Sequence, residues 1–344
     1  MYIKEAAVRL NTTPRAIRFY EEKGLIFPKK DKENDYRYFT ENDVVRLSTI
    51  LALREVGLGL ERIKDLLENS EMSINEYLNL QRSALFEQWL ELKDMITTID
   101  QMIGSTEDEK DDMEAIFKLA NQLKKLKDSR KNWEDKWEFD DWADEYENYI
   151  KKDGYVFNVH QDYDDALEKV AEVMELKHKS VCLDIGIGTG NLGSKFIARG
   201  VHVIGVDQSE KMLQTCNGKY PEIETRKGHF LALPLLDHSV DGIVSSYALH
   251  HLPDKDKLLA LEEMNRVLKE NGQICIADLM FQNEDHRSRV IDAFRSQGNI
   301  EAVQSIEDEF YGDRSLLVKW LEANSYQVET HQFNDILSMI YAKK

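Results

Sequence analysis

Residues 183–190 read LDIGIGTG, and this stretch decides the fold of the larger part of the chain. Its first half continues an apolar run that begins at Val181, as expected of a buried strand. Its second half has glycine at every other position, which lets a backbone turn tightly and approach a ligand closely. The stretch therefore predicts a strand, then a ligand-binding loop, then a helix.

Strand and helix patterns alternate on the C-terminal side of this loop. We expect strands at 181–185, 201–206, 241–245, 274–279, 327–333 and 336–342, with helices at 192–198, 210–219 and 257–268. Such alternation predicts a parallel sheet covered by helices on both faces.

The spacing of the glycines distinguishes between two kinds of ligand-binding loop. A dinucleotide-binding loop requires Gly-x-Gly-x-x-Gly or Ala, and here the third glycine comes one residue early. The spacing Asp-x-Gly-x-Gly-x-Gly instead resembles the first motif of class I methyltransferases that use S-adenosylmethionine. The resemblance extends over about residues 136–344 and implies an α/β, Rossmann-like methyltransferase domain with S-adenosylmethionine as its cofactor.

The same resemblance implies a set of cofactor-binding residues. Asp207 ends the next strand, where a carboxylate can accept hydrogen bonds from both ribose hydroxyls. His229 stands where the family usually has an acid beside the adenine, and Tyr146 belongs to a segment similar to an N-terminal lid, with Trp142. The full cofactor set is Asp184, Gly186, Gly188, Gly190, Asp207, Gln208, Met212, His229, Phe230, Ser245 and Tyr146.

The segment after the strand at 241–245 is the candidate catalytic region. It reads YALHHL, and the resemblance sets it beside the transferred methyl group. Methyl transfer mainly requires alignment, and a base is needed only when the acceptor must lose a proton. His250 or His251 could supply that base and Tyr247 could orient the acceptor, although packing is the alternative role for these side chains.

The acceptor class is narrowed by motifs that the chain lacks. Amino-methylation of DNA bases usually uses an Asp- or Asn-Pro-Pro-aromatic string where this chain has Ser-Ser-Tyr-Ala, and none of the three cysteines follows a proline. We therefore favour a small-molecule acceptor. A regulator that senses S-adenosylmethionine or a metabolite without turnover is the alternative, and a nucleic-acid methyltransferase is a weaker one.

The N-terminal 75 residues have a different pattern, with short helices separated by turns. Residues 13–26, TPRAIRFYEEKGLI, begin with a Thr-Pro helix start and follow a short helix at 3–10. Helix, turn and helix, then a β-prone segment at 36–40, is the layout of a DNA-reading head. It resembles the winged helix-turn-helix of MerR-type transcription regulators, which bind promoter DNA as dimers. The resemblance implies DNA contacts from Arg15, Arg18, Tyr20, Tyr36 and Arg37.

Residues 76–103 predict one long helix with an apolar seam. Leu78, Leu85, Leu92 and Ile99 recur every seven residues, which is typical of a coiled coil. We expect it to join two copies into a homodimer, although packing within one chain is the alternative. Residues 104–135 would be a linker with a connecting helix.

Charge and composition bound the remaining possibilities. The total net charge of −19 argues against DNA binding. Residues 1–75, however, have equal numbers of basic and acidic side chains, and residues 9–30 carry six basic and two acidic ones. Three cysteines without a CxxC pair predict neither a disulfide framework nor a metal site and fit the cytoplasm. No apolar run is long enough to cross a membrane.

Overall fold

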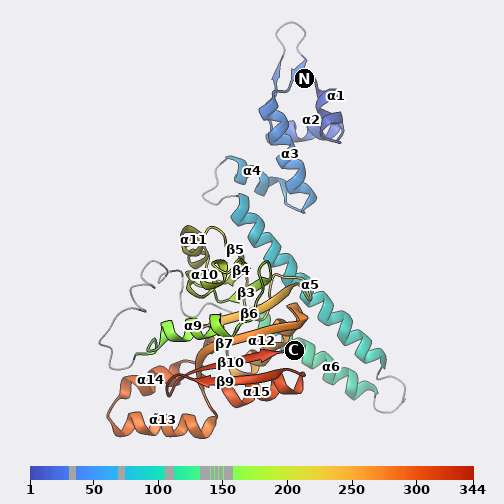
Figure 1. Ribbon diagram of the computed structural model, residues 1–344. Coiled ribbons are helices and arrows are strands. Elements are labelled where there is room, and N and C mark those ends of the chain that lie inside the picture. The colour runs from blue at the N-terminus through green and yellow to red at the C-terminus, as the bar shows by residue number, and fades with distance from the viewer. Residues whose placement is uncertain are drawn as a thin grey trace. The chain divides into compact units, whose positions relative to one another are not determined.

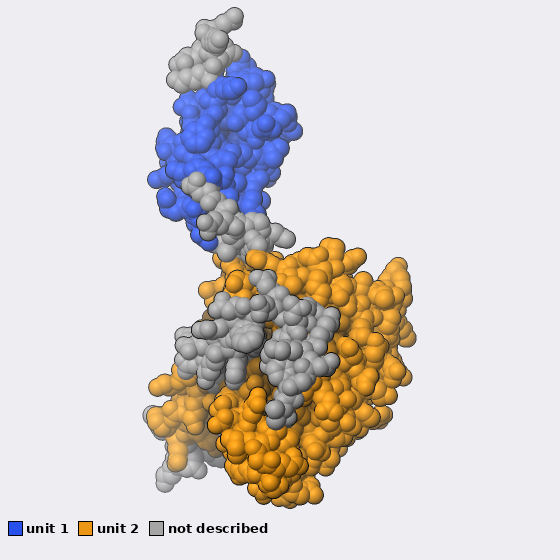
Figure 2. Space-filling model, turned by 90° about the vertical axis from the view of Figure 1, so that its left-hand side faces the viewer, with its two compact units in different colours: residues 1–78 blue, residues 79–344 orange. Residues whose placement is uncertain are grey.

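The computed structural model describes residues 1–30, 36–68, 74–104, 112–131, 140, 143, 146, 150 and 158–344. These residues form two compact units, residues 1–78 and 79–344 (Figure 2). Trp142, part of the expected lid segment, lies outside the described residues.

The N-terminal unit is a small helical domain with a two-stranded sheet. Its elements are α1 (Ile3–Arg9), α2 (Pro14–Glu22), β1 (Lys29–Lys30), β2 (Arg37–Tyr38), α3 (Glu41–Glu55) and α4 (Leu60–Glu68). The Thr13 hydroxyl caps α2 by accepting a hydrogen bond from the Ala16 N–H at 3.1 Å, and Pro14 starts the helix. Ile17 and Leu25 are completely buried in the core of this unit. The helix-turn-helix and the β-hairpin after it agree with the sequence prediction.

The C-terminal unit is built on an eight-stranded sheet with helices on both faces (Figure 1). The strands run in the order β5-β4-β3-β6-β7-β10-β9, with β8 paired to β7. Their bounds are β3 Val181–Ile185, β4 His202–Asp207, β5 Glu224–Lys227, β6 Val240–Ser246, β7 Leu268–Phe281, β8 Gly312–Asp313, β9 Gln327–Gln332 and β10 Leu337–Lys343.

Two apolar layers hold helices against this sheet. Alternate residues of β7 enter different layers: Cys275 and Ala277 join one cluster, whereas Ile274 and Ile276 join the other, as the two-residue repeat of a strand requires. The helices of the unit beyond residue 158 are α9 Tyr163–Val173, α10 Asn191–Ile197, α11 Glu210–Lys219, η1 Leu249–His251, α12 Asp254–Val267, α13 Glu284–Ser296, α14 Ile300–Asp308 and α15 Arg314–Ala323.

The expectation of a fully parallel sheet is wrong at one edge. β10 is antiparallel to both β7 and β9, whereas β3, β4, β5, β6 and β7 pair in parallel. The reason is the short connection between β9 and β10, because a few residues can only reverse a chain, whereas a parallel return requires a crossover.

The chain order reverses at β3, which lies between β4 and β6. In open sheets of this kind, the carboxyl ends of the strands at such a switch point form a crevice that binds ligands. The loops that follow β3, β4 and β6 therefore enclose the expected site.

Two long helices precede the sheet. α5 runs from Ile74 to Gly104 and α6 from Asp112 to Lys131. From residue 79 onward α5 belongs to the C-terminal unit. None of the described helices is long and apolar enough to cross a membrane.

Candidate functional site

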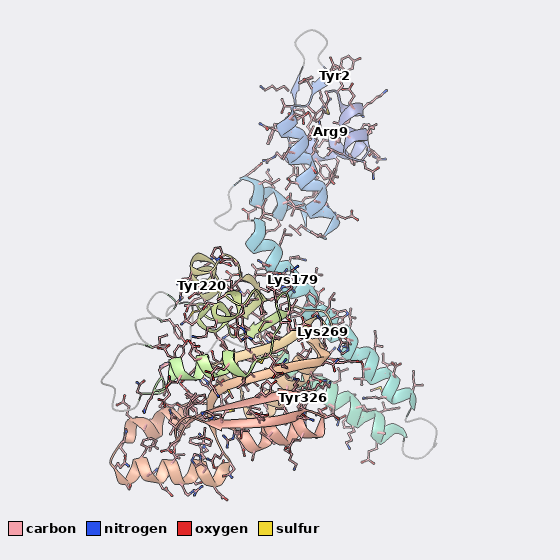
Figure 3. The ribbon with its side chains drawn as sticks, viewed as in Figure 1. Tyr2, Arg9, Lys179, Tyr220, Lys269 and Tyr326 are labelled. Atoms are coloured by element: carbon pink, nitrogen blue, oxygen red, sulfur yellow. The ribbon has the colours of Figure 1, made fainter. Side chains whose placement is uncertain are left out.

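The glycine loop after β3 adopts the conformation that its sequence predicts. Gly186, Gly188 and Gly190 all have positive φ, at 69°, 52° and 92°. A Cβ at Gly186 would lie 2.4 Å from the Cβ of Ala248, so only glycine fits there. A Cβ at Gly190 would meet Cys216 and the ring of Tyr220, which Figure 3 labels. No atom lies within 4 Å of a Cβ at Gly188, so the loop leaves open space at its centre.

A cavity opens over this loop at the carboxyl ends of β3, β4 and β6. It brings together residues from 146 to 251 of the chain. Its lining consists of Tyr146, Tyr163, Ile185, Gly186, Ile187, Gly188, Thr189, Asn191, Leu192, Val206, Asp207, Gln208, Met212, Gly228, His229, Phe230, Ser246, Tyr247, Ala248 and His251.

Asp207 is held by backbone groups at the edge of this cavity. One carboxylate oxygen accepts a hydrogen bond from the Gly188 N–H and the other from the Ser209 N–H, both at 2.9 Å. The Ser209 hydroxyl caps α11 at the Met212 N–H. Each carboxylate oxygen has further acceptor capacity, so Asp207 is positioned to bind a vicinal diol.

His229 could accept from the adenine amino group through a neutral ring nitrogen, or the backbone could serve instead. Its Nδ1 accepts a hydrogen bond from the Leu231 N–H at 3.3 Å. In a neutral ring this assigns the proton to Nε2, which is a donor and lies 4.0 Å from Oε1 of Glu87 on α5. An amino group of the ligand therefore needs a different acceptor, such as a backbone carbonyl.

Three residues of the predicted cofactor set do not line the cavity. The Ser245 hydroxyl is buried and donates to the Ile185 carbonyl at 2.8 Å, which is a structural contact. Gly190 packs against α11. Asp184 lies beneath the loop, 1% exposed, and mainly burial, but also the charge of Asp207, raises its pKa to about 8. The other eight predicted residues line the cavity.

Two of the three candidate catalytic residues line the cavity and the third does not. Tyr247 and His251 line the cavity, whereas His250 does not. The His250 ring is buried, and its Nδ1 lies 2.5 Å from Oδ1 of Asp278. The structure therefore contradicts a direct catalytic role for His250: its ring lies beside that of His251, with 4.0 Å between the ring centres, but it is paired with Asp278 and does not line the cavity.

Asp278 fixes the loop that carries these residues. Its carboxylate accepts hydrogen bonds from the N–H groups of Ala248 (3.0 Å), Leu249 (2.6 Å) and Leu279 (2.7 Å) as well as contacting His250. The loop therefore keeps Tyr247 at φ 48°, an uncommon backbone conformation for a large side chain.

The electrostatics of this cluster separate the two histidines. Burial alone lowers the pKa of His250, but the charge and hydrogen bond of Asp278 and the charge of Glu309 outweigh it and raise the pKa. Burial and then the charge of His250 lower the pKa of His251 well below its usual value. His251 is therefore neutral beside the cavity, while His250 and Asp278 form a buried ion pair.

Four lining residues that sequence analysis did not select join the site from two helix starts. Tyr163 begins α9, and its hydroxyl accepts a hydrogen bond from the Asn191 amide at 3.2 Å. Thr189, Asn191 and Leu192 belong to the junction of the glycine loop and α10. The position of Asn191 directly after the motif was a usable signal, whereas nothing local marks Tyr163.

The N-terminal unit presents only some of its predicted DNA contacts. Arg15 and Arg18 are exposed on α2, and Tyr36 is 67% exposed. The guanidinium of Arg37 donates to Glu21 at 2.5 Å. Tyr20 is only 8% exposed and packs in the core with Ile17. The structure therefore contradicts the predicted contact of Tyr20 with DNA.

Comparisons with known proteins assign a different family to each of the two units. Residues 1–70 match the MerR HTH family of regulatory proteins, and residues 182–272 match a methyltransferase domain family. An uncharacterized methyltransferase of Oceanobacillus iheyensis is 33% identical over 207 residues, which are 60% of this chain and 95% of that relative. The uncharacterized methyltransferase YrrT of Halobacillus halophilus is 30% identical with the same coverage.

The solved structure of YcgJ from Bacillus is 26% identical, with a TM-score of 0.41 over 49% of this chain and 71% of that one. The fold, the glycine loop and the cavity define an S-adenosylmethionine-dependent methyltransferase of class I that carries a MerR-type helix-turn-helix domain. The chain belongs to the family of these methyltransferases.

The residues of the cavity fit S-adenosylmethionine. Gly186 and Gly188 leave room that a Cβ would fill or restrict, Asp207 would hold the ribose, and Met212 and Phe230 would offer apolar surface to the adenine. When bound, the cofactor supplies a methyl group that is already activated by a positive sulfur. The protein's part is to align the acceptor and to exclude water.

Proposed function

We propose that this chain is a dimeric promoter-binding regulator of MerR type whose methyltransferase domain methylates a small molecule. The observation that supports turnover is a cavity whose lining combines Asp207 and the glycine loop with Tyr163, Tyr247 and His251.

Turnover is tested with labelled S-adenosylmethionine and the small-molecule fraction of a cytosolic extract. We expect a labelled small product and no label in DNA or RNA. Tight cofactor binding without any product would favour the sensing alternative, and labelled nucleic acid would overturn the choice of acceptor. Asp207→Ala is the control, because it should remove product formation by removing cofactor binding.

The DNA-binding part of the proposal rests on α2. Its exposed Arg15 and Arg18 lie on the face opposite the buried Ile17, where they can reach phosphates or base edges. Selection of duplexes bound by the full chain from fragments of its own promoter region tests this part. We expect a pseudo-palindromic site whose affinity falls steeply with salt, and binding without sequence preference would contradict it.

Dimerisation through residues 76–103 is supported by a stripe of exposed apolar side chains on α5. Leu85, Leu92, Ile96, Ile99 and Ile103 are each 48–65% exposed in the single chain. They repeat at intervals of three, four and seven residues, as a helix that pairs with another helix requires. Leu92→Asp with Ile99→Asp should convert the dimer to a monomer in sedimentation, whereas Gln101→Asp, on another face of α5, should not.

A second function, control of DNA binding by the cofactor, is favoured by how α5 packs. The Ser83 hydroxyl donates to the carbonyl of Lys227, and the next three residues after Lys227 line the cavity. The amine of Lys93 donates to Asp237 at 2.8 Å. One face of the helix that continues from the DNA-binding unit therefore rests on the loop beside the adenine side of the cavity.

Arg266 ties the same helix to the rest of that loop. Its guanidinium lies 5.2 Å from the centre of the Trp89 ring and donates to the carbonyls of Leu233 and Leu235. A change in the loop when the cofactor binds would alter the contacts of α5. Operator affinity should therefore differ with and without S-adenosylmethionine, and Trp89→Ala should reduce that difference. Equal affinities in the wild type would exclude cofactor control.

A further inference from the structure

The acceptor side of the cavity is a cluster of aromatic rings. The ring of Tyr247 lies 5.1 Å from that of Tyr163, centre to centre, and His160 stacks on Tyr247 at 5.3 Å with 22° between the planes. His160 also meets Tyr163 edge to face at 5.9 Å. Tyr146 lines the same cavity. Three tyrosines thus surround the space next to the open centre of the glycine loop.

These rings are fixed by contacts on both sides of the cavity. The Tyr163 hydroxyl is bonded to Asn191 at the end of the glycine loop, and the backbone of the loop after Tyr247 is bonded to Asp278. Tyr247 is 8% exposed, and its hydroxyl has no hydrogen-bond partner among the described residues. Because that hydroxyl is itself sealed from solvent, the surface that Tyr247 offers to the cavity is its ring.

The charge around the rings favours a cation. Among the described residues that line the cavity there is no lysine or arginine. Burial, and then the charge of His250, lower the pKa of His160 to about 4, so this ring is neutral at pH 7. Besides burial, the charge of Asp278 and then the neighbouring hydroxyls of Tyr163 and Tyr146 raise the pKa of Tyr247. Among the same described lining residues Asp207 supplies the one carboxylate, so the charge at the cavity surface favours a cation.

Aromatic faces attract cations, because the centre of each ring is electron-rich. We propose that the wall formed by Tyr163 and Tyr247, with His160 stacked on Tyr247, binds an amine as its ammonium ion, and that the amine nitrogen is the methyl acceptor. This inference rests on the proposed small-molecule methylation and names the acceptor's chemical class.

The reaction balances without a strong base in the site. The ammonium ion first releases its proton to solvent water, because His251 has a pKa well below its usual value and is too weak a base to hold it, and the freed lone pair forms the new N–C bond. The C–S bond of the cofactor breaks with its electron pair remaining on sulfur. The nitrogen thereby regains the positive charge that the rings attract.

Binding of a probe cation tests the wall without any turnover. Choline and its uncharged isostere 3,3-dimethyl-1-butanol are titrated by calorimetry into the full chain loaded with S-adenosylhomocysteine. We expect choline to bind about tenfold to thirtyfold more tightly than the alcohol, which is the range of a desolvated cation–π contact. Equal affinities would overturn the proposal.

Two substitutions at one position separate the ring from the hydroxyl. Tyr247→Phe keeps the aromatic face and should retain the preference for choline, whereas Tyr247→Leu should lose most of it. Phe117→Leu is the matched control, because Phe117 is 69% exposed on α6 and should change neither affinity. Loss of the preference in the phenylalanine variant would show that the hydroxyl rather than the ring face binds the probe.

The labelled product distinguishes failure of this inference from failure of the proposed function. A labelled product that is retained on a cation exchanger supports an amine acceptor. A labelled small product that is neutral or anionic would refute the amine and leave small-molecule methylation standing. Absence of any labelled small product would refute methylation, and the choline preference would then remain as evidence for an amine-sensing site.

Discussion

Replacing Asp278 by asparagine tests how the loop beside the cavity is held. The carboxylate of Asp278 is completely buried, and it accepts three backbone hydrogen bonds and pairs with His250. An asparagine of nearly the same size places an NH₂ group where an acceptor is needed. At least one buried N–H then loses its partner, and the charge that stabilises the His250 imidazolium disappears.

The expected loss follows from these two terms. Removing one partner of a buried ion pair costs about 3–5 kcal/mol, and an unsatisfied buried donor alone about 1–3 kcal/mol. His250 can give up its proton in the variant, which limits the sum. We therefore expect Asp278→Asn to lower the free energy of unfolding by about 3–5 kcal/mol at pH 6.

The loss should depend on pH in a defined direction. The pKa of His250 is raised by folding, so its contribution is complete below the usual value of 6.5 and disappears as the pH rises through the folded-state pKa. The pKa of Asp278 is lowered, so its contribution is complete above 3.8 and disappears as the pH falls through its folded-state value. Wild type and variant should therefore differ most between about pH 4 and 6.5 and less at pH 9.

Urea unfolding followed by tryptophan fluorescence measures the difference in unfolding free energy within the C-terminal unit, which contains Asp278. All five tryptophans lie beyond residue 78, so the signal reports on the C-terminal unit. Asp292→Asn, at an exposed carboxylate on α13, is the control and should change stability by less than about 0.5 kcal/mol. A loss below about 1 kcal/mol for Asp278→Asn at pH 6, or one that is equal at pH 6 and 9, would refute the reasoning.

Three further predictions concern the cofactor site and the DNA-binding head. Asp207→Ala should weaken S-adenosylmethionine binding by at least about tenfold in calorimetry, because the ribose loses a charged acceptor, and an unchanged affinity would exclude that role. Gly186→Ala should cost about 1–3 kcal/mol in urea unfolding and reduce cofactor binding, since a Cβ would lie 2.4 Å from that of Ala248, whereas Gly218→Ala, with open space around it, should be nearly neutral. Arg18→Ala should reduce operator affinity and the salt slope without altering cofactor binding, and normal operator binding would show that α2 is not the recognition helix.

The sequence was sufficient where one short segment carries the whole signal. The glycine loop and Asp207 were predicted because they lie at a strand end, which fixes their direction toward the crevice. The strand at 181–185 and the helix at 210–219 have the predicted bounds. By contrast, β9 and β10 have apolar patterns that do not reveal whether their neighbours run parallel or antiparallel, and only the short turn between them does.

The residues that were misplaced or missed depend on which face of a helix is buried. Tyr20 lies three residues after Ile17, so a helix that buries one also buries the other. His250 and His251 are neighbours in sequence and their rings lie 4.0 Å apart, yet only His251 reaches the cavity, while His250 is held by Asp278. Tyr163 reaches the cavity from a helix that precedes the glycine loop by about twenty residues, and this contact exists only in the folded sheet.

The apolar residues of α5 fall on two faces, so a single seam does not account for all of residues 76–103. Leu90 is 1% exposed and lies with Ser83, Trp89 and Lys93 on the face that contacts the methyltransferase unit, whereas Leu85 and Leu92 lie on a neighbouring face that stays exposed. The two faces meet at Trp89, which lies seven residues before Ile96, so pairing with a second copy would use the residues on the far side of that line, Leu85, Leu92 and Ile99. If packing within the chain and this pairing both occur, a cofactor-dependent shift of α5 would change the dimer interface and the spacing of two DNA-binding heads together. That spacing is what a dimer reads in a pseudo-palindromic site, so one helix would link the cavity to the choice of promoter.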